Sequence, residues 1–345
     1  MMLVVVVLAA CQATPSESEL AQEGRVAVSS VASAAVAATC EVSELLVPSC
    51  GAWFGASTPS ADGRYDYRLG LDEYESLARN TPDILRFYHR GAGPIPTDEE
   101  TSLSERPGQQ RSLLFLSWKP DPTMTWRQIA DGEADASIKS VAQGLRSYPH
   151  RLFLTIHHEP ENDVVETKDS GMTPEDYVSM YRHVVGALND LGVDNVVYVM
   201  NYMGFERWAT IVDRLYPGND VVDWIAYDPY AFGQHVRFSE VLDELGDASW
   251  PGFYSWAVEK APTKPIMLAE WGLDPETHSD SASLVEDLAD TLRLDFPQIK
   301  ALVYWNDTGK KLNPRLRSGT ERADLFNEAF RRLASDLYFN EMEPS

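Results

Sequence analysis

The sequence predicts an α/β fold, a single (β/α)8 TIM barrel in which eight parallel strands alternate with helices. From residue 50 onward, short apolar runs rich in β-branched and aromatic residues alternate with helical patterns, which is typical of βα units around a parallel sheet. Eight such runs can be counted, as a closed barrel requires. A doubly wound sheet is the alternative, but no glycine-rich phosphate loop follows the first run.

The predicted strands lie near residues 50–56, 83–89, 112–118, 151–159, 194–201, 222–228, 265–270 and 299–305. Helices are predicted between them, near residues 71–79, 134–147, 173–190, 204–215, 250–260, 281–295 and 320–337. Thr173-Pro174-Glu175-Asp176 begins one helix with an N-cap residue, a proline at the first position and two acids in the first turn. The Gly- and Pro-rich stretch 90–110 is predicted as a long loop insertion after the second strand.

The N-terminal region has the features of an export segment. Its first apolar run is too short to span a bilayer, and Leu8-Ala9-Ala10-Cys11 resembles a bacterial lipobox, which predicts lipid attachment at Cys11. A generic signal peptide or an untranslocated start are the alternatives. We therefore expect a signal segment at 1–11, a flexible tether at 12–39 and the barrel domain at 40–340.

Two thiols remain if Cys11 carries lipid. An even pair of cysteines in an exported chain predicts a disulfide between Cys40 and Cys50, with two buried free thiols as the alternative. The expected location is therefore the cell surface, as a lipoprotein, or the extracellular space.

The charge balance restricts the partners. The chain has 53 acidic and 29 basic residues, for a formal charge of −24, which argues against nucleic acid and against an anionic lipid surface. This charge suits a protein that acts on a neutral substrate, although it also fits a solvated acidic surface. We expect a monomer whose contact with a membrane is only through the lipid anchor.

Two glutamates at the ends of apolar runs indicate the chemistry. Arg151-Leu-Phe-Leu-Thr-Ile-His-His-Glu159 is one run, and Lys264-Pro-Ile-Met-Leu-Ala-Glu270 is the other. A (β/α)8 barrel places its catalytic groups at the carboxyl ends of its strands. Two carboxylates, one protonated and one ionised, are the groups that cleave a glycosidic bond.

Polar and aromatic side chains end the other strands too, and these ends should meet in one cleft. The residues at these ends are Arg86, His89, Trp118, His158, Glu159, Asn201, Asp228, Tyr230, Glu270, Trp305, Asn306 and Asp307. Aromatic platforms beside carboxylates and amides suit sugars, and Trp118, Trp271, Trp305 and Tyr230 would supply the platforms. A single strand tryptophan is nevertheless more often part of the core.

No metal site or other cofactor is expected. His157, His158 and Glu159 are adjacent, and adjacent strand residues point to opposite faces. The HxH and HExxH patterns of zinc sites are absent from the sequence.

The barrel region resembles glycoside hydrolase family 26, a family of retaining (β/α)8 glycosidases. Four motifs carry the resemblance: His158-Glu159, Ala269-Glu270-Trp271-Gly272, Tyr230 in Ala226-Tyr-Asp-Pro-Tyr, and Trp305 in Val303-Tyr-Trp-Asn. The resemblance implies that Glu159 is the acid/base and Glu270 the nucleophile. It also implies that Tyr230 bonds the nucleophile and that Trp305 lies beneath the reactive sugar.

The strand ends and the resemblance together give an expected substrate site and substrate. His158, Trp118, Asn201, Asp228, Tyr230, Trp271 and Trp305 are the expected substrate-binding residues. The expected substrate is a β-linked polysaccharide, foremost β-1,4-mannan, with β-1,3-xylan and mixed-linkage glucan as alternatives. A non-catalytic glycan-binding lipoprotein on the same barrel is another alternative.

A double displacement sets requirements on the two glutamates. Their carboxyl groups should lie about 5 to 5.5 Å apart. Burial and repulsion from Glu270 should raise the pKa of Glu159. Glu161 is the alternative acid, because it follows Glu159 by two residues.

Overall fold

The computed structural model describes residues 40–233, 235–243 and 249–340. The predicted signal segment, the lipidation site Cys11 and the tether 12–39 lie outside these residues, so they and the domain boundaries stay predictions. Contacts between Cα atoms separate residues 1–39 from a unit that begins at Cys40, and only this second unit is described below. Within the described residues, no helix is long and apolar enough to cross a membrane.

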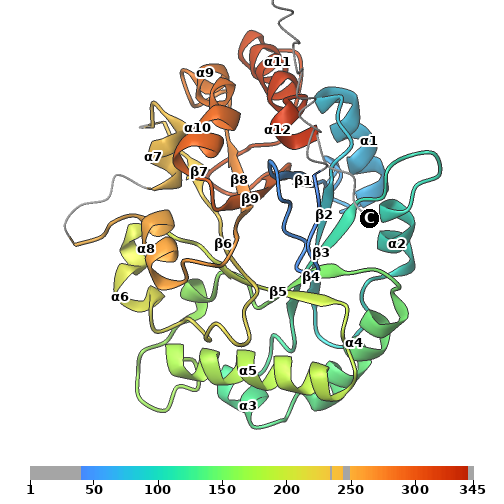
Figure 1. Ribbon diagram of the computed structural model, residues 1–345, viewed down its shortest axis with the longest axis vertical. Coiled ribbons are helices and arrows are strands. Elements are labelled where there is room, and N and C mark those ends of the chain that lie inside the picture. The colour runs from blue at the N-terminus through green and yellow to red at the C-terminus, as the bar shows by residue number, and fades with distance from the viewer. Residues whose placement is uncertain (1–39, 234, 244–248, 341–345) are drawn as a thin grey trace, which may run out of the picture. The chain divides into compact units, whose positions relative to one another are not determined.

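Eight parallel strands form a closed ring (Figure 1), which confirms the predicted (β/α)8 barrel. Neighbours in the ring follow the chain order, and β6 pairs with β8 to close it. The strands are β1 (Trp53–Ser57), β2 (Ile84–Arg90), β3 (Leu113–Lys119), β4 (Leu152–Ile156), β5 (Val196–Tyr202), β6 (Trp224–Tyr227), β8 (Ile266–Leu273) and β9 (Ile299–Trp305). Each overlaps one of the eight predicted runs. The two-residue strand β7 (Tyr230–Ala231) pairs only with β8.

Helices surround the ring (Figure 1). They are α1 (Tyr67–Ala78), α2 (Asp98–Ser104), α3 (Trp126–Ala130), α4 (Asp135–Ser147), α5 (Pro174–Asp190), α6 (Ala209–Val212), α7 (Phe238–Leu242), α8 (Phe253–Lys260), α9 (Ser281–Glu286), α10 (Leu288–Asp295), α11 (Glu321–Ala334) and α12 (Leu337–Asn340), with short 3-10 helices η1 (Pro160–Asp163) and η2 (Glu206–Trp208). The predicted insertion over 90–110 lies between β2 and β3 and contains the short helix α2, which was not predicted. Thr97 and Glu100 form a capping box that begins α2 there, and such a reciprocal cap stabilises a short helix despite its Gly- and Pro-rich surroundings.

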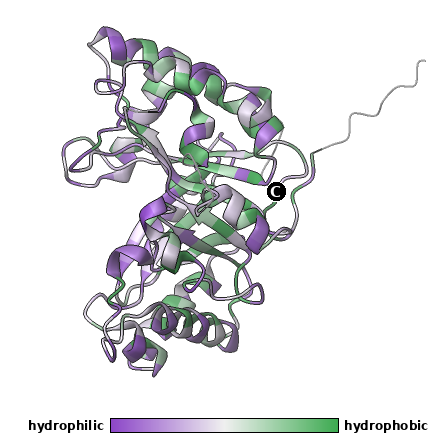
Figure 2. Ribbon diagram, turned by 90° about the vertical axis from the view of Figure 1, so that its left-hand side faces the viewer, coloured by the Kyte–Doolittle hydropathy of each residue, from purple (hydrophilic) through white to green (hydrophobic). Residues whose placement is uncertain are grey.

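Side-chain alternation along the strands divides the core into two layers. One cluster lies between the strands and the helices. The other contains only strand residues and residues of the segment before β1, so it fills the barrel: Trp53, Ile84, Leu113, Phe115, Phe153, Val197, Val199, Trp224, Ala226, Met267, Ala269, Ala301 and Val303, with Leu46. Figure 2 shows the mostly hydrophobic strands between helices that also carry hydrophilic residues. Because residues two apart face the same layer, the parity of each strand decides which side chains can reach its open end.

The segment 40–50 closes the end of the barrel at which the strands begin. Leu46 joins the interior cluster, and its carbonyl accepts a hydrogen bond from Trp53 Nε1 at 2.8 Å. Trp224 Nε1 donates to the Leu45 carbonyl at 2.7 Å. A disulfide joins Cys40 to Cys50, with the Cα atoms 5.5 Å apart. The predicted bridge thus ties together the two ends of this segment, which we call the N-terminal plug.

Candidate active site

A cleft opens at the carboxyl ends of the strands, at the opposite end from the plug. Its volume is about 640 Å³, and it is lined by Glu159 after β4, by Glu270 of β8 and by the loops after β5, β6 and β9. Aromatic and apolar side chains make up much of the wall: Phe205, Tyr227, Tyr230, Phe232, Phe253, Trp305 and Leu312. A concave, partly aromatic wall with two carboxylates is suited to a sugar.

An irregularity in β8 directs Glu270 to this cleft. Leu268 pairs with Leu302 and Trp271 pairs with Tyr304, so β8 has one more residue than β9 over this interval. Such a bulge lets two consecutive residues face the same side of a sheet. Ala269 lies in the barrel interior and Glu270 lines the cleft above it.

Three side chains hold the Glu270 carboxylate. Tyr88 donates to Oε1 at 2.7 Å and Tyr230 donates to Oε2 at 2.6 Å. Burial raises the pKa of both phenols well above the ordinary value, so both remain protonated donors. Arg86 Nη2 lies 3.3 Å from Oε1. Glu270 is only 7% exposed. The three contacts fix the orientation of its carboxylate, as nucleophilic attack requires.

Arg86 and Tyr88 form part of the site; Arg86 is among the predicted strand-end residues, whereas Tyr88 is not. Arg86 is fully buried and donates to the Ala269 carbonyl at 2.5 Å and to Asn201 Oδ1 at 2.8 Å. The signal was present in the alternation of β2. Ile84 lies in the barrel interior, so Arg86 and Tyr88 share its face, whereas His89 points away from the cleft.

Glu159 stands beyond the end of β4, in a turn that leaves strand geometry. Its φ is +51°, and its backbone N–H donates to the Asn201 carbonyl at 2.9 Å. Asn162 Nδ2 donates to Oε2 at 3.1 Å. Burial, followed by repulsion from Glu270, raises the pKa of Glu159 to about 7, in the expected direction. A carboxyl group with this pKa can hold a proton near neutral pH and release it to a leaving group.

A polar network fixes the chain on both sides of Glu159. His157 accepts a hydrogen bond from Trp126 Nε1 at Nδ1, so its Nε2–H donates to Asp163, at 2.7 Å. Burial lowers the pKa of His157, and the hydrogen bond from His157 lowers that of Asp163. A neutral imidazole therefore bridges α3 to η1, the short helix that follows Glu159.

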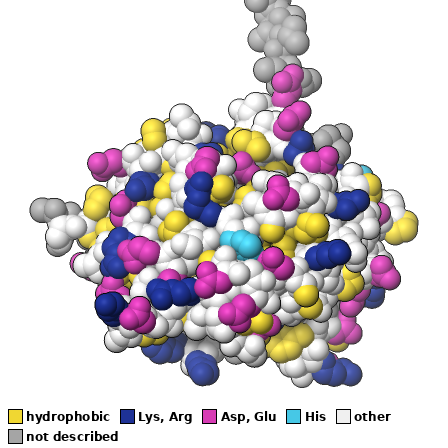
Figure 3. Space-filling view, turned by 90° about the horizontal axis from the view of Figure 1, so that it is seen from below, with side chains coloured by type: hydrophobic (Ala, Val, Ile, Leu, Met, Phe, Trp, Pro, Cys, Tyr) yellow, Lys and Arg dark blue, Asp and Glu magenta, His cyan; other side chains and the backbone are white. Residues whose placement is uncertain are grey.

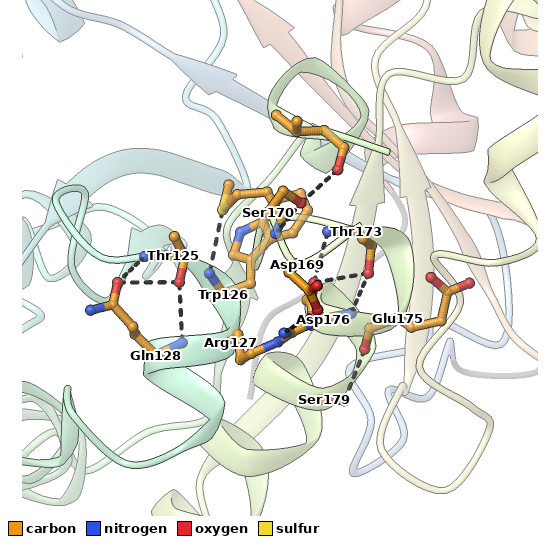
Figure 4. A network of polar contacts seen from close by, with 12 residues as sticks. Thr125, Trp126, Arg127, Gln128, Asp169, Ser170, Thr173, Glu175, Asp176 and Ser179 are labelled. Atoms are coloured by element: carbon orange, nitrogen blue, oxygen red, sulfur yellow. Dashed lines mark hydrogen bonds and ion pairs between the residues drawn. The ribbon is translucent and has the colours of Figure 1, made fainter. Parts of the chain in front are cut away.

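Farther along, the loop between β4 and α5 is fastened to α3 (Figure 4). Arg127 Nε donates to Asp176 at 2.9 Å, and the Arg127 backbone N–H donates to the Gly171 carbonyl at 3.1 Å. Capping boxes begin both helices, with Thr125 and Gln128 at α3 and Thr173 and Asp176 at α5. The predicted helix start at Thr173 is confirmed, and the cap holds the loop that follows the acid/base candidate.

Asp228 and Asn201 lie beneath the cleft and do not line it. Asn201 Nδ2 donates to Asp228 Oδ1 at 3.0 Å, and both residues are fully buried. Burial and repulsion from Glu270 raise the pKa of Asp228 well above the ordinary value, although Arg86 opposes this shift. The prediction that Asn201 contacts substrate is corrected, because its amide is already engaged with Arg86, Asp228 and the Tyr202 carbonyl.

One oxygen from each of Glu159, Asp228 and Glu270 lies within 4.8 Å of the other two. Three carboxylate oxygens at this spacing can also coordinate a divalent cation. Arg86, however, already brings a positive charge to Glu270 and to Asp228, at 3.3 and 3.8 Å.

Two predicted sugar platforms belong to the core. Trp118 and Trp271 are both 0% exposed. Trp118 lies on the same face of β3 as Leu114 and Leu116, which point to the helices, and its Nε1 donates to the Gly91 carbonyl at 3.0 Å. Trp271 follows the bulge and packs against Phe330 of α11 with a ring distance of 6.1 Å. Strand alternation therefore excludes both from the cleft.

Trp305 and Tyr230 do lie in the cleft. Trp305 is partly exposed, and its ring meets Tyr230 edge to face at 5.8 Å. Gly272 makes room for the loop that carries this wall, because a Cβ there would lie 2.7 Å from Pro314. The close packing against Pro314 thus explains why the third position of the Glu-Trp-Gly motif is a glycine.

His158 and Glu161 do not line the cleft, unlike Glu159 and Glu270. His158 lies beside Tyr88, with a ring distance of 5.5 Å, and burial lowers its pKa well below the ordinary value, so it is neutral. Glu161 is 1% exposed and does not line the cleft. Its Oε1 accepts from the backbone N–H of Met203 at 2.8 Å. Glu161 thus ties η1 to the loop after β5, which favours Glu159 over Glu161 as the acid.

The fold and this site define a (β/α)8 barrel with one glutamate after its fourth ring strand and a second near the end of its seventh. No model of a known protein family matches the chain. The chain is 25% identical over 224 residues to Endoglucanase H of Acetivibrio thermocellus, an alignment that covers 63% of this chain and 24% of that protein. The chain therefore matches about a quarter of the length of this curated relative.

Solved structures with the same fold include several mannanases. A ruminal GH26 endo-β-1,4-mannanase superposes with a TM-score of 0.57 at 18% identity, over 84% of this chain and 64% of that one. A β-mannanase from a symbiotic protist of the termite Reticulitermes speratus gives 0.56 at 14% identity, over 86% and 96%. The Cellulomonas fimi endo-β-1,4-mannanase gives 0.55 at 17% identity, over 84% and 71%. The expected resemblance to glycoside hydrolase family 26 is confirmed in the fold.

Proposed function

We propose that this protein is a retaining glycoside hydrolase that cleaves a β-linked polysaccharide. The observation that carries the proposal is the closeness of the two glutamates, whose nearest carboxylate oxygens lie within 4.8 Å. Retaining enzymes hold their carboxyl groups about 5 to 5.5 Å apart, and inverting enzymes need about 6.5 to 9.5 Å to admit a water molecule. The closeness of these oxygens fits the shorter of the two spacings and so supports a retaining mechanism.

The contacts assign a role to each glutamate. Glu270 is held by two phenols and a guanidinium, so it is the ionised group that attacks the anomeric carbon. Glu159, with a pKa of about 7, gives its proton to the departing oxygen. It then takes a proton from the water that releases the sugar from Glu270.

The first candidate substrate is β-1,4-mannan, since two of the similar structures are named endo-β-1,4-mannanases. The curated relative is named an endoglucanase, so mixed-linkage glucan is the second candidate. Product analysis on mannan, β-1,3-xylan and lichenan distinguishes them. If wild-type protein binds one of these glycans without cleaving any, the alternative of a non-catalytic binding protein holds.

Variants of the two glutamates test the roles. Glu270→Ala should abolish cleavage of every glycoside, because no other group forms the covalent intermediate. Glu159→Ala should fail on polysaccharide yet still react with an activated aryl glycoside, whose leaving group departs without a proton. Azide should then speed the turnover of this variant and give a β-glycosyl azide.

Glu161→Gln is the matched control, because Glu161 lies two residues away and is excluded from the cleft. This variant should keep activity on polysaccharide and show no azide effect. Rescue of a Glu161 variant in place of Glu159→Ala would reassign the acid. Inverted product in the NMR spectrum of a wild-type digest would contradict the whole mechanism.

For location, we propose a cell-surface lipoprotein anchored through Cys11. The proposal rests on the sequence Leu8-Ala9-Ala10-Cys11 and on the Cys40–Cys50 disulfide, which is a feature of proteins that fold in an oxidising compartment.

A further inference from the structure

Many of the lysines and arginines in the described residues are paired with carboxylates, as the charge of −24 would favour. Figure 3 shows one such surface, the side at which α3 and α5 lie in Figure 1, where Lys and Arg side chains alternate with Asp and Glu. The ion pairs of these two helices include Arg127 with Asp176, Arg182 with Asp220 and Arg214 with Glu175.

The cleft differs from this surface. Arg207 of η2 and Lys311 of the loop after β9 both line it and are both exposed. Within residues 40–233, 235–243 and 249–340, neither forms an ion pair. Lys310 is also exposed beside Lys311. Glu206 lines the cleft as well, and so do Glu159 and Glu270, so Arg207 and Lys311 are the lysine and arginine side chains of an otherwise acidic and aromatic wall.

Aromatic rings hold the Arg207 guanidinium in place. It lies 5.1 Å from the Trp208 ring and 5.6 Å from the Phe205 ring, and Phe205 is itself part of the cleft wall. Stacking engages the face of a guanidinium and leaves its edge N–H groups available, although Arg207 Nη2 also donates to Met203 Sδ at 3.6 Å. Those N–H groups match a carboxylate, a sulfate or a phosphate in a bidentate geometry.

We propose that the cleft binds an anionic substituent on its glycan, held between Arg207 and Lys311. The inference rests on the proposed function and adds to it a class of substrate: a β-linked glycan whose sugars near the scissile bond carry a carboxylate, sulfate or phosphate group. The neutral part of each sugar contacts the aromatic wall, and the substituent contacts the two cations.

Matched oligosaccharides test the inference. The probes are a β-1,4-mannooligosaccharide, the same oligosaccharide oxidised at C6 to a uronic acid, and the same oligosaccharide sulfated at O6. Because each exposed ion pair contributes modestly, wild-type kcat/KM should be about 5- to 30-fold higher for an anionic probe than for the neutral one at low salt. The preference should shrink when the Debye length is reduced to about 3 Å with 1 M salt.

Variants locate the effect. Arg207→Gln and Lys311→Gln should each bring the anionic-to-neutral ratio of kcat/KM towards one, through KM. Arg293→Gln is the matched control: this arginine also stacks on a ring, Tyr338, at 5.1 Å, it does not line the cleft, and its loss changes the net charge equally. The control should keep the wild-type ratio.

The outcomes separate the inference from the proposed function. Cleavage of the neutral probe with a ratio of one at every salt concentration would overturn the inference and leave the glycosidase intact. If no probe is cleaved, calorimetric binding of the same probes to Glu270→Ala decides: tighter binding of an anionic probe supports the inference, and equal binding contradicts it. A preference for the uronic acid alone or for the sulfate alone identifies the source of the charge.

Discussion

At the scale of single residues, two glutamates three ring strands apart acquire different chemistry from their surroundings. Glu270 receives two phenol hydrogen bonds and lies beside Arg86. Glu159 accepts a hydrogen bond from the Asn162 amide and lies buried near the Glu270 carboxylate, and its pKa rises to about 7. The difference in function therefore comes from the neighbours and not from the residue type.

This raised pKa predicts a pH dependence. Glu159 must be protonated to act as the acid, so kcat/KM on polysaccharide should fall as pH rises through about 7, by about tenfold for each further unit. Glu159→Ala with an activated aryl glycoside should lose this basic limb in the step that forms the glycosyl-enzyme. A limb that persists in Glu159→Ala would assign the titration to another group, and Glu161→Gln should leave the limb where it is in wild type.

Two tryptophans of the site motifs should respond differently to truncation. Trp271 is fully buried against α11, so Trp271→Ala should lower the free energy of unfolding by about 3 to 5 kcal/mol. Trp305 is partly exposed in the cleft, so Trp305→Ala should reduce turnover strongly with a smaller loss of stability. Urea unfolding and kinetics of both variants check this. Normal turnover in Trp305→Ala would place the ring outside the reactive subsite.

At the scale of elements, alternation explains which site residues could be predicted from the sequence. The glutamates, Tyr230 and Trp305 were predicted and lie together in the cleft. The prediction for Trp118 and Trp271 is wrong because it depends on their closeness to a strand end. It does not take into account that their side chains point to the helix-facing side of the strand. Tyr88 was missed for the same reason, although the inward positions of Ile84 and Arg86 indicate it.

Other features could not be predicted from the periodicity of the sequence. The bulge in β8 adds one residue against β9, and no local composition marks it. His157 and Glu159 have positive φ values, +53° and +51°, so β4 ends before its apolar run does. Because the chain then leaves strand geometry, Glu161 does not face the same side as Glu159, as a spacing of two strand residues would imply. Helix α2 depends on a two-residue capping box within a stretch of Gly and Pro. Each of these is a local exception to the periodicity on which the strand and helix predictions depend.

The N-terminal plug should contribute stability without contributing to catalysis. Removing the disulfide with Cys40→Ser and Cys50→Ser frees a short loop, which by loop entropy should cost about 2 to 3 kcal/mol. Leu46→Ala should cost a similar amount by leaving a cavity among the interior residues. Thermal unfolding measures both losses, and kcat should stay at the wild-type value because the cleft is at the other end of the barrel. A reduced kcat in folded variants would contradict this separation.

At the scale of the whole molecule, the lipoprotein proposal predicts where the protein is found. Cys11→Ser should move the protein from the membrane fraction to the soluble fraction, because a lipid chain provides the membrane affinity. Mass spectrometry of the mature wild-type N-terminus should find a lipid-modified residue 11. Unchanged fractionation of Cys11→Ser, or a mature chain that starts at another residue, would refute the anchor.

The position of the plug also has a consequence for orientation. The barrel domain begins at Cys40, at the closed end where the strands start, and the mouth of the cleft is at the far end. A chain held through residues before Cys40 is thus attached at the base of the barrel. Such an attachment leaves the mouth free to face outward, where a polymer too large to reach beneath the protein can still enter it.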